Sequence, residues 1–188
     1  MNGPTTRDSS LVNGVDVDAL RAKAAAIAAD PKLGMTRWNV TTRWKGGARS
    51  DTSVTSCEIG GERVQKDFTI RVDEPVELLG TNQFANPQEV LMAALNACMT
   101  FGYVANFALQ GITLRELSIE TSGAIDLRGF LGDPSVKPGY DELNYTVHVK
   151  ADATPAQIEL VHDVVTRTSP NYFNLSQPVR LRSRLVTH

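Results

Sequence analysis

The side chains of this sequence that could carry out chemistry are two cysteines and an arginine. Cys98 lies in the middle of the longest apolar run, and Cys57 lies in a segment that reads as a strand. A cysteine reacts as its thiolate, which needs a positive neighbour, a polar pocket and access for a substrate. Arg71, in the segment FTIRVDE, is the candidate neighbour, because the apolar residues beside it would face the other side of a strand. These residue types would supply the chemistry of a reactive thiolate.

Each of these residues also has an interpretation without chemistry. Cys98 can be a small core residue, since free cysteine is among the most buried residue types. Cys57 can pack within its strand, and Arg71 can be a solvated strand residue. Gln88 and Glu89 lie ten and nine positions before Cys98, nearly three helical turns away, so neither reaches the thiol along a helix. A loop fold or a partner subunit would have to bring them to it.

Other kinds of chemistry find little support in the sequence. The three histidines, His148, His162 and His188, are scattered without the spacing of metal ligands, and no Gly-rich phosphate loop precedes a helix. There is no nucleophile elbow, and a Cys-His hydrolase would lack an evident base. We therefore expect neither a metal nor a cofactor.

The element that must position Cys98 is a helix from Asn86 to Gly111. Asn86 can cap the first turn, Pro87 suits the first helical position, and Glu89 completes a capping box. The segment between them is apolar on nearly all faces, which is typical of a buried helix. Its length is that of a membrane span, but polar residues interrupt it and no basic flank accompanies it. We expect the core helix of a soluble protein.

The remaining elements predict an α+β protein with antiparallel sheets. Period-two alternation indicates strands, and apolar residues at helical spacing indicate helices. We expect helices over residues 15–29 and 154–168, strands over residues 35–44, 52–59, 64–73, 114–126, 142–151 and 178–186, and loops over residues 73–85 and 127–140. Residues 1–34 would form an N-terminal extension with one helix, and residues 35–188 a single domain. These few short strands cannot cover the apolar helix on all sides. We therefore infer that a second subunit covers part of it.

Composition indicates which binding partners to exclude and in which cellular compartment the protein is expected. The chain of 188 residues is 41% hydrophobic and has a formal net charge of −2, without the clustered cations that nucleic acid or an anionic membrane would require. The N-terminus MNGPTTRDSS has no apolar run for a secretion signal, so we expect a cytoplasmic protein. There both cysteines would be kept reduced, and a bond between them would be catalytic or redox-sensing.

The segment NPQEVLMAALNAC resembles the NPEELLxAAxxxC segment of the OsmC/Ohr family of bacterial thiol peroxidases. FTIRVDE is similar to the strand of that family that carries an arginine, and HDVVTRTSPNYFNL resembles its second helix and the turn that follows. The resemblance implies an intertwined homodimer with strands around two central helices. It also implies reduction of organic hydroperoxides in the response to oxidative stress. Cys98 would be the peroxidatic cysteine and Arg71 its activating arginine.

The sequence departs from this family at two supporting positions. Ser169 stands where the family has its resolving cysteine, and Gln88 stands where the family has a glutamate that holds the arginine, although the neighbouring Glu89 can substitute. Three outcomes follow: an enzyme with one working cysteine that an external thiol reduces, a cycle in which Cys57 resolves Cys98, or a catalytically impaired dimer. The impaired dimer would bind a small apolar or acyl ligand near Cys98 and residues 127–140.

Overall fold

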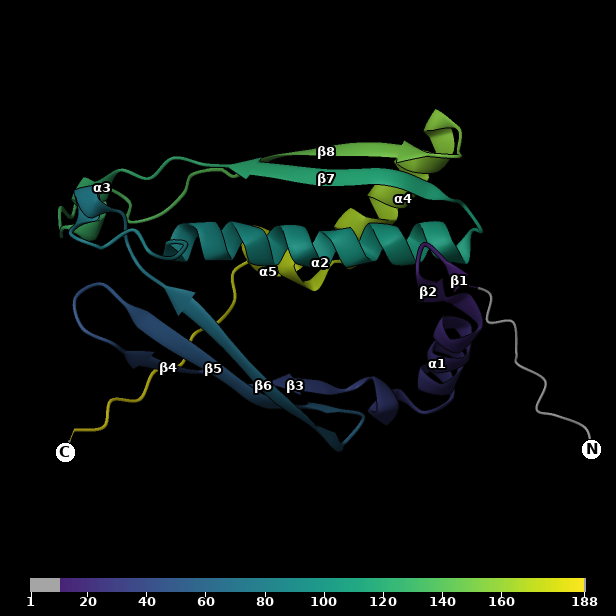
Figure 1. The fold of residues 1–188 in the computed structure, drawn as a ribbon, viewed down its shortest axis with the longest axis horizontal. Helices are drawn as coiled ribbons and strands as arrows, with labels where there is room; N and C mark the ends of the chain where they lie inside the picture. The colour runs from purple at the N-terminus through teal and green to yellow at the C-terminus, as the bar shows by residue number, and fades with distance from the viewer. Residues whose placement is uncertain (1–10, 188) are drawn as a thin grey trace, which may run out of the picture. The chain divides into compact units, whose positions relative to one another are not determined.

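The structure is a computed structural model that describes residues 11–187. The chain divides after Ala93 into two compact units, and each is described here by itself. Both contain antiparallel strands and helices, so the predicted α+β class with antiparallel sheets and one long helix is confirmed (Figure 1). Residues 1–10 of the predicted N-terminal extension, and His188, lie outside the described residues.

The first unit begins with a hairpin and a helix. The carboxylate of Asp16 caps this helix by accepting a hydrogen bond of 2.9 Å from the backbone N–H of Ala19. The predicted helix over residues 15–29 is therefore confirmed, with a start two residues later. These elements are β1 (Leu11–Val12), β2 (Val15–Asp16), α1 (Val17–Ala29) and the 3-10 helix η1 (Pro31–Gly34).

The sheet of the first unit is built around β5 (Ser50–Ile59), which pairs antiparallel with β3 (Thr36–Trp38), β4 (Thr41–Trp44) and β6 (Glu62–Val72). The predicted strands over residues 52–59 and 64–73 are confirmed. The predicted strand over residues 35–44 is two short strands instead. Alternation is typical of a half-buried strand, yet Trp44 is 77% exposed. Alternation shows that one face of a strand can be covered, but not that anything in the chain covers it.

A buried carboxylate orders the connection before the long helix. Asp73 accepts hydrogen bonds from the hydroxyl of Thr81 at 2.5 Å and from the backbone N–H groups of Thr81 and Gln83. These bonds, the hydroxyl of Thr81 first among them, lower the pKa of Asp73 to about 2. The connection also contains the 3-10 helix η2 (Val76–Leu78).

The long helix α2 (Pro87–Leu109) begins and ends as the sequence predicts. Asn86 accepts a hydrogen bond of 2.8 Å from the N–H of Glu89, and the carboxylate of Glu89 accepts one of 2.7 Å from the N–H of Asn86. This is the expected capping box. Gly111, at a φ of +68°, follows the last turn in the left-handed conformation that glycine adopts without strain.

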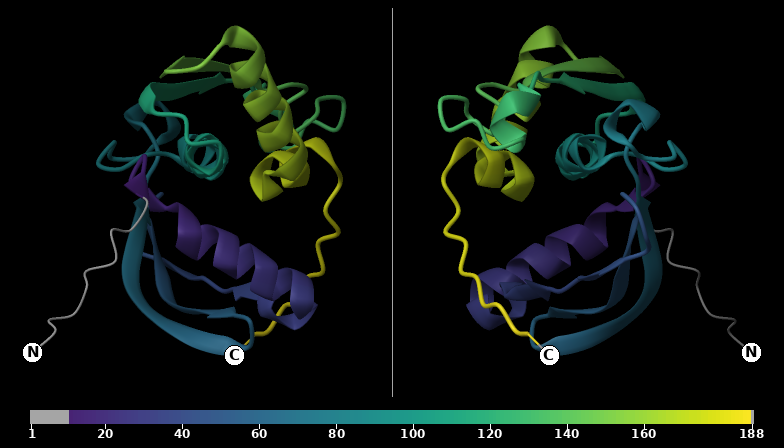
Figure 2. Two further views of the ribbon diagram at one scale, coloured as in Figure 1. Left: turned by 90° about the vertical axis from the view of Figure 1, so that its right-hand side faces the viewer. Right: turned by 90° about the vertical axis from the view of Figure 1, so that its left-hand side faces the viewer.

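The core of the second unit lies under one face of α2. Four buried side chains recur along that face, and a two-stranded sheet and a second helix cover them; they are Leu95, Met99, Tyr103 and Phe107. The sheet pairs β7 (Leu114–Ser122) with β8 (Asn144–Ala151), and the second helix is α4 (Pro155–Thr168), with Val161 and Val165 fully buried. Figures 1 and 2 show α4 beside α2 within this unit.

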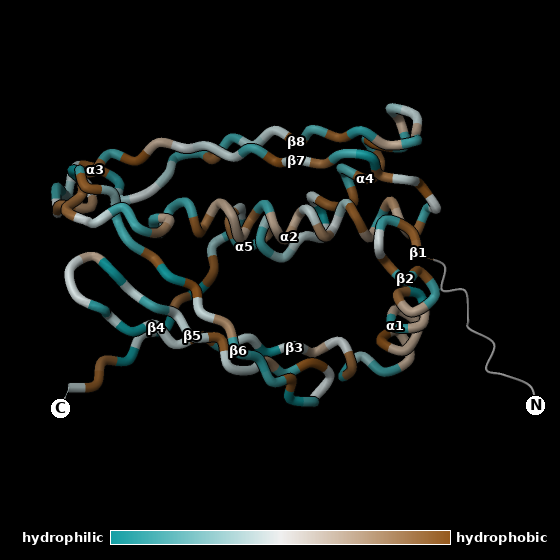
Figure 3. The backbone as a smooth tube through the Cα atoms, in the orientation of Figure 1, coloured by the Kyte–Doolittle hydropathy of each residue, from teal (hydrophilic) through white to brown (hydrophobic). Residues whose placement is uncertain are grey.

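The single chain buries only part of α2, in line with the expectation that its own strands cannot cover the helix on all sides. Figure 3 shows hydrophobic residues along its whole length, yet Leu91 and Phe101 are exposed, Phe101 to 64%. Among the described residues α2 is the one helix long and apolar enough to cross a membrane, a test that core helices of soluble proteins also pass. Its buried face forms the centre of the second unit, as a core helix does.

Two other segments differ from the prediction. Residues 178–186 form no strand and are exposed, because a strand needs a neighbouring edge to satisfy its backbone, which the alternating pattern does not supply. The Ser169-Pro170 pair ends α4 as predicted, but it also begins a helix that the sequence analysis missed, α5 (Pro170–Ser176). The predicted loop over residues 127–140 contains the short helix α3 (Leu127–Phe130).

Candidate active site around Cys98

The structure places Ser169 against Cys98. The hydroxyl of Ser169 donates a hydrogen bond to Sγ of Cys98 over 3.3 Å between oxygen and sulfur. Ser169 is only 5% exposed, and Cys98 is partly buried. The contact thus joins the two residues that the resemblance assigns to the positions of a resolving and a peroxidatic cysteine. This contact joins positions 71 residues apart in the sequence.

Two helices hold the Ser169 hydroxyl in place. The backbone N–H of Ser169 donates to the carbonyl of Val165 and so closes α4, while its side chain accepts from the N–H of Tyr172 and so caps α5. The side chain of Asn171, on α5, donates to the carbonyl of Ala94 on α2 at 2.8 Å. The hydroxyl therefore lies at a fixed junction rather than on a free loop, because it donates one hydrogen bond and accepts another there.

Contacts along the two helices continue from this junction in antiparallel order. Gly102 lies against Val165, and a Cβ at Gly102 would be 3.2 Å from Cγ1 of that valine. Further along, the hydroxyl of Tyr103 and Nδ1 of His162 are 2.5 Å apart. From one contact to the next, the residue number on α2 increases while the residue number of its partner decreases, so the two helices run antiparallel. Glycine at 102 allows the close approach that brings the thiol to the junction.

The sheet fixes the other side of α2 near the thiol. The side-chain amide of Asn96 donates to the backbone carbonyl of Ile119 at 3.1 Å, and its carbonyl accepts a hydrogen bond of 2.6 Å from the hydroxyl of Thr121. In the sequence, Asn96 is one of the polar residues that interrupt the apolar run. The structure shows that it attaches α2 to β7.

A hydroxyl that donates to sulfur can stabilise negative charge on that sulfur. A hydrogen bond to the charged form of a group favours that form, and bonds to charged groups are stronger than neutral ones. Ser169 therefore offers Cys98 part of the support that a reactive thiolate needs. It offers no second thiol, so the pair cannot form a disulfide.

The other predicted site residues lie in the first unit or at the start of α2. Arg71 is exposed on β6, opposite Asp51 of β5, with its guanidinium 5.6 Å from the ring centre of Phe84. Gln88 is exposed, and the carboxylate of Glu89 is engaged in the capping box. Their roles at the thiol stay predictions.

Cys57 is buried in the first unit. It lies in β5, opposite Trp38 of β3 and Val64 of β6, and its surroundings are those of a packed strand residue. Its proposed part in resolving Cys98 stays a prediction. Among residues 11–187, no three His, Cys, Asp or Glu side chains gather as a metal site would require.

Solved structures of one class share this fold, in which antiparallel sheets accompany a long core helix. An OsmC-like protein from Mycoplasma pneumoniae matches 74% of this chain and 87% of its own, with 16% identity and a TM-score of 0.59. A protein from Psychrobacter arcticus, named for osmotic-stress induction and detoxification, matches the same shares with 18% identity and a TM-score of 0.54. An OsmC-like protein from Vibrio cholerae matches 73% of this chain and 92% of its own, with 15% identity and a TM-score of 0.52.

The sequence itself matches the family model for OsmC-like proteins over residues 80–184, more than half of the chain. The chain therefore belongs to the OsmC-like proteins, as its resemblance predicts. A comparison with curated proteins finds no match.

Proposed function

We propose that this protein is a thiol-dependent peroxidase that reduces organic hydroperoxides through Cys98, in the oxidative-stress response of a bacterial cytoplasm. The observation that carries the proposal is the hydrogen bond of 3.3 Å from Ser169 to the Cys98 sulfur. It joins the two positions that the resemblance assigns to the family's cysteine chemistry. Membership of the OsmC-like proteins supports the proposal at the level of the family.

The proposed reaction proceeds by displacement at oxygen. The Cys98 thiolate attacks the terminal oxygen of the hydroperoxide, the O–O bond breaks, and the departing alkoxide takes a proton and leaves as the alcohol. Cys98 is then a sulfenic acid. In this proposal Arg71 polarises the peroxide, and Gln88 or Glu89 orients the arginine.

Because Ser169 cannot supply a second sulfur, the proposed cycle uses an external thiol. Its thiolate attacks the sulfenic sulfur of Cys98, hydroxide leaves as water after protonation, and a mixed disulfide forms. A second thiol, or the other arm of a dithiol, then attacks the mixed disulfide and releases the Cys98 thiolate. The alternative route through Cys57 would form an internal disulfide at the first of these steps.

We further propose a homodimer. The exposed Leu91 and Phe101 on α2 give the helix a second apolar face that the single chain leaves open. Residues 178–186 alternate apolar and arginine side chains but pair with no strand among the described residues. A second copy would supply both the missing cover and the missing sheet edge.

The test is consumption of cumene hydroperoxide in the presence of dithiothreitol. We expect the wild-type protein to turn over and Cys98→Ser to fall to the rate without protein. Cys57→Ser is the matched control, and under the external-thiol route it keeps the wild-type rate. Equal slow rates for the wild type and Cys98→Ser would contradict the proposal. Loss of turnover in Cys57→Ser, with an internal disulfide in the wild type, would replace the external-thiol route by the internal one.

The second function that the sequence predicts is binding of a small apolar or acyl ligand near Cys98 and residues 127–140. It stays a prediction. Mass spectrometry of the native protein for a co-purifying ligand tests it, and a clean mass of the protein alone would count against it.

A further inference from the structure

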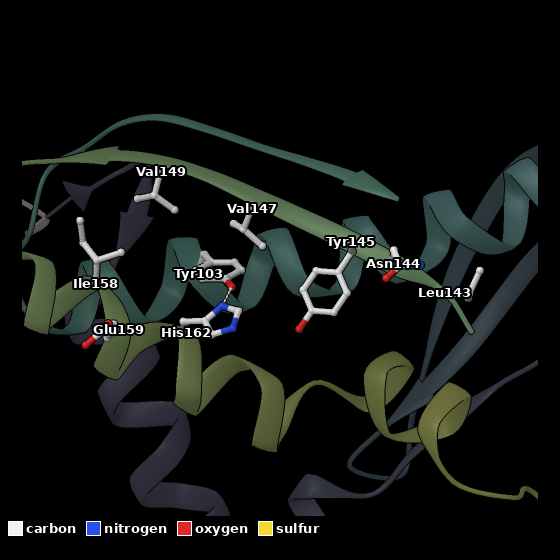
Figure 4. Close-up of a pocket in the computed structure, with 9 residues that line it drawn as sticks. All are labelled: Tyr103, Leu143, Asn144, Tyr145, Val147, Val149, Ile158, Glu159 and His162. Carbon is white, nitrogen blue, oxygen red and sulfur yellow. Dashed lines mark hydrogen bonds between the residues drawn. The ribbon is translucent and has the colours of Figure 1, made fainter. Parts of the chain in front are cut away.

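A cavity of about 600 Å³ lies in the second unit between β8 and α4 (Figure 4). Alternate residues of β8, including Val147 and Val149, and Ile158 of α4 give it an apolar wall. Its size suits a small organic molecule. Neither Cys98 nor Ser169 lines it, so it is a separate feature from the thiol site.

Among the polar residues that line this cavity are Tyr103 and His162, whose hydroxyl and Nδ1 are 2.5 Å apart. Tyr103 is fully buried, and burial first, with a smaller effect of Tyr145, raises the pKa of its phenol to about 12. The phenol therefore keeps its proton at neutral pH. A buried hydroxyl proton without an acceptor is costly, and Nδ1 of His162 is the acceptor within reach.

The direction of this hydrogen bond sets the tautomer of His162. If the phenol donates to Nδ1, the neutral imidazole carries its own proton on Nε2. Among residues 11–187, Nε2 of His162 has no hydrogen-bond partner. Figure 4 shows His162 and Tyr145 pointing into the same space below β8. The cavity thus presents a hydrogen-bond donor beside an apolar wall.

The charge of the lining selects against anions. Glu159 is the one carboxylate among the lining residues, and no lysine or arginine lines the cavity. A ligand with a carboxylate or a phosphate would therefore meet a like charge without a cation to compensate it. An uncharged oxygen can accept from Nε2–H of His162 without this penalty.

We propose that this cavity binds a small uncharged amphiphile, such as a medium-chain alcohol. Its oxygen accepts a hydrogen bond from Nε2–H of His162, and its carbon chain lies along the valines of β8. This site does not depend on the chemistry of Cys98. Binding is therefore expected to persist in Cys98→Ser, whatever the outcome of the peroxidase assay.

The test is a titration of the full-length protein with 1-octanol, followed by NMR of the histidine rings. Octanol is expected to shift the ring signals of His162 in a saturable way. The exposed His148, on the outward face of β8, is the internal control and should not move. Octanoate, the matched anion, should bind more weakly than octanol, and Glu159→Gln should narrow that difference.

The variant that tests the donor is Tyr103→Phe together with His162→Phe. Replacing both partners by apolar groups of similar shape leaves no buried polar group unpaired, so the protein should stay folded. Loss of one neutral hydrogen bond should weaken octanol binding about fivefold, measured by isothermal titration calorimetry. If this variant does not fold, the comparison of octanol with octanoate in the wild type and in Glu159→Gln still tests whether the cavity prefers an uncharged ligand. No saturable shift of His162, equal shifts of both histidines, or equal binding of octanol and octanoate would overturn the proposal.

Discussion

Ser169→Cys should give this protein an internal disulfide in a single substitution. The oxygen of Ser169 and the sulfur of Cys98 are 3.3 Å apart, and a disulfide requires about 2.05 Å between two sulfur atoms. The longer C–S bond of the new cysteine supplies part of the difference. Because α4 and α5 hold residue 169 in place, the remaining closure is a small adjustment of side chains.

The gain in stability from this disulfide follows from the length of the loop that the bond would close. Cys98 and Ser169 are 71 positions apart, and loop-closure entropy for such a loop corresponds to about 4 kcal/mol of stability in the oxidised variant. The reduced variant should be less stable than the wild type by about 1 kcal/mol, because cysteine is a poorer cap for α5 than serine. The oxidised variant should therefore melt roughly 10 °C above the reduced one.

The assay is addition of one equivalent of cumene hydroperoxide, followed by peptide mapping without reductant. The reasoning predicts a peptide that links positions 98 and 169 in Ser169→Cys, and the same peptide in the double variant with Cys57→Ser. Both thiols free after the peroxide is consumed, or a melting temperature that does not respond to oxidation, would refute the account of the junction.

Three further predictions concern the thiol, the connection before α2, and the two faces of α2. Ser169→Ala should slow alkylation of Cys98 by iodoacetamide at neutral pH roughly tenfold, because the sulfur loses a donor that stabilises its charge; an unchanged rate would show that the hydroxyl does not act on the thiolate. The pKa of Asp73 is lowered to about 2 in the folded protein, so its contribution to stability is complete above the ordinary value near 4 and is lost as pH falls toward 2. Asp73→Asn should remove that part of the pH dependence of the unfolding free energy, measured by urea unfolding between pH 2 and about 4.5. If the unfolding free energies of the wild type and Asp73→Asn fall in parallel over this range, the prediction is contradicted. Phe107→Ala, at a fully buried position, should cost about 3–5 kcal/mol of unfolding free energy. Phe101→Ala, at an exposed position of the same helix, should cost little and should instead weaken the proposed dimer in sedimentation experiments.

The parts of the fold that the sequence predicted well are those set by local interactions. The capping box of Asn86 and Glu89 and the left-handed Gly111 each depend on residues within a few positions of one another. The start and end of α2 could therefore be predicted before any tertiary contact was known.

The parts that the sequence analysis missed depend on distant contacts. Nothing local to Ser169 indicates that its hydroxyl reaches Cys98, because the contact needs the antiparallel packing of α2 and α4. The family resemblance marked Ser169 as a lost function, whereas the structure shows it as a donor to the thiol. The sequence likewise shows His162 only as one of three scattered histidines, and its partner Tyr103 lies 59 positions away.

Exposure was the property that the sequence predicted least well. The alternating residues 178–186 and the apolar faces of α2 indicate surfaces that can be covered, and in the single chain many of them are open. Hydrophobic pattern sets which side of an element should be buried, but a neighbouring element or a second chain has to bury it.

We propose that Cys98 is a nucleophile toward organic hydroperoxides, and the sulfenic acid that it would form can be detected. The protein is treated with one equivalent of cumene hydroperoxide in the presence of a sulfenic-acid trap and analysed by peptide mass spectrometry. We expect a trapped adduct on Cys98, none on Cys57, and release of one equivalent of the alcohol. An unmodified Cys98 with the hydroperoxide left intact would contradict it.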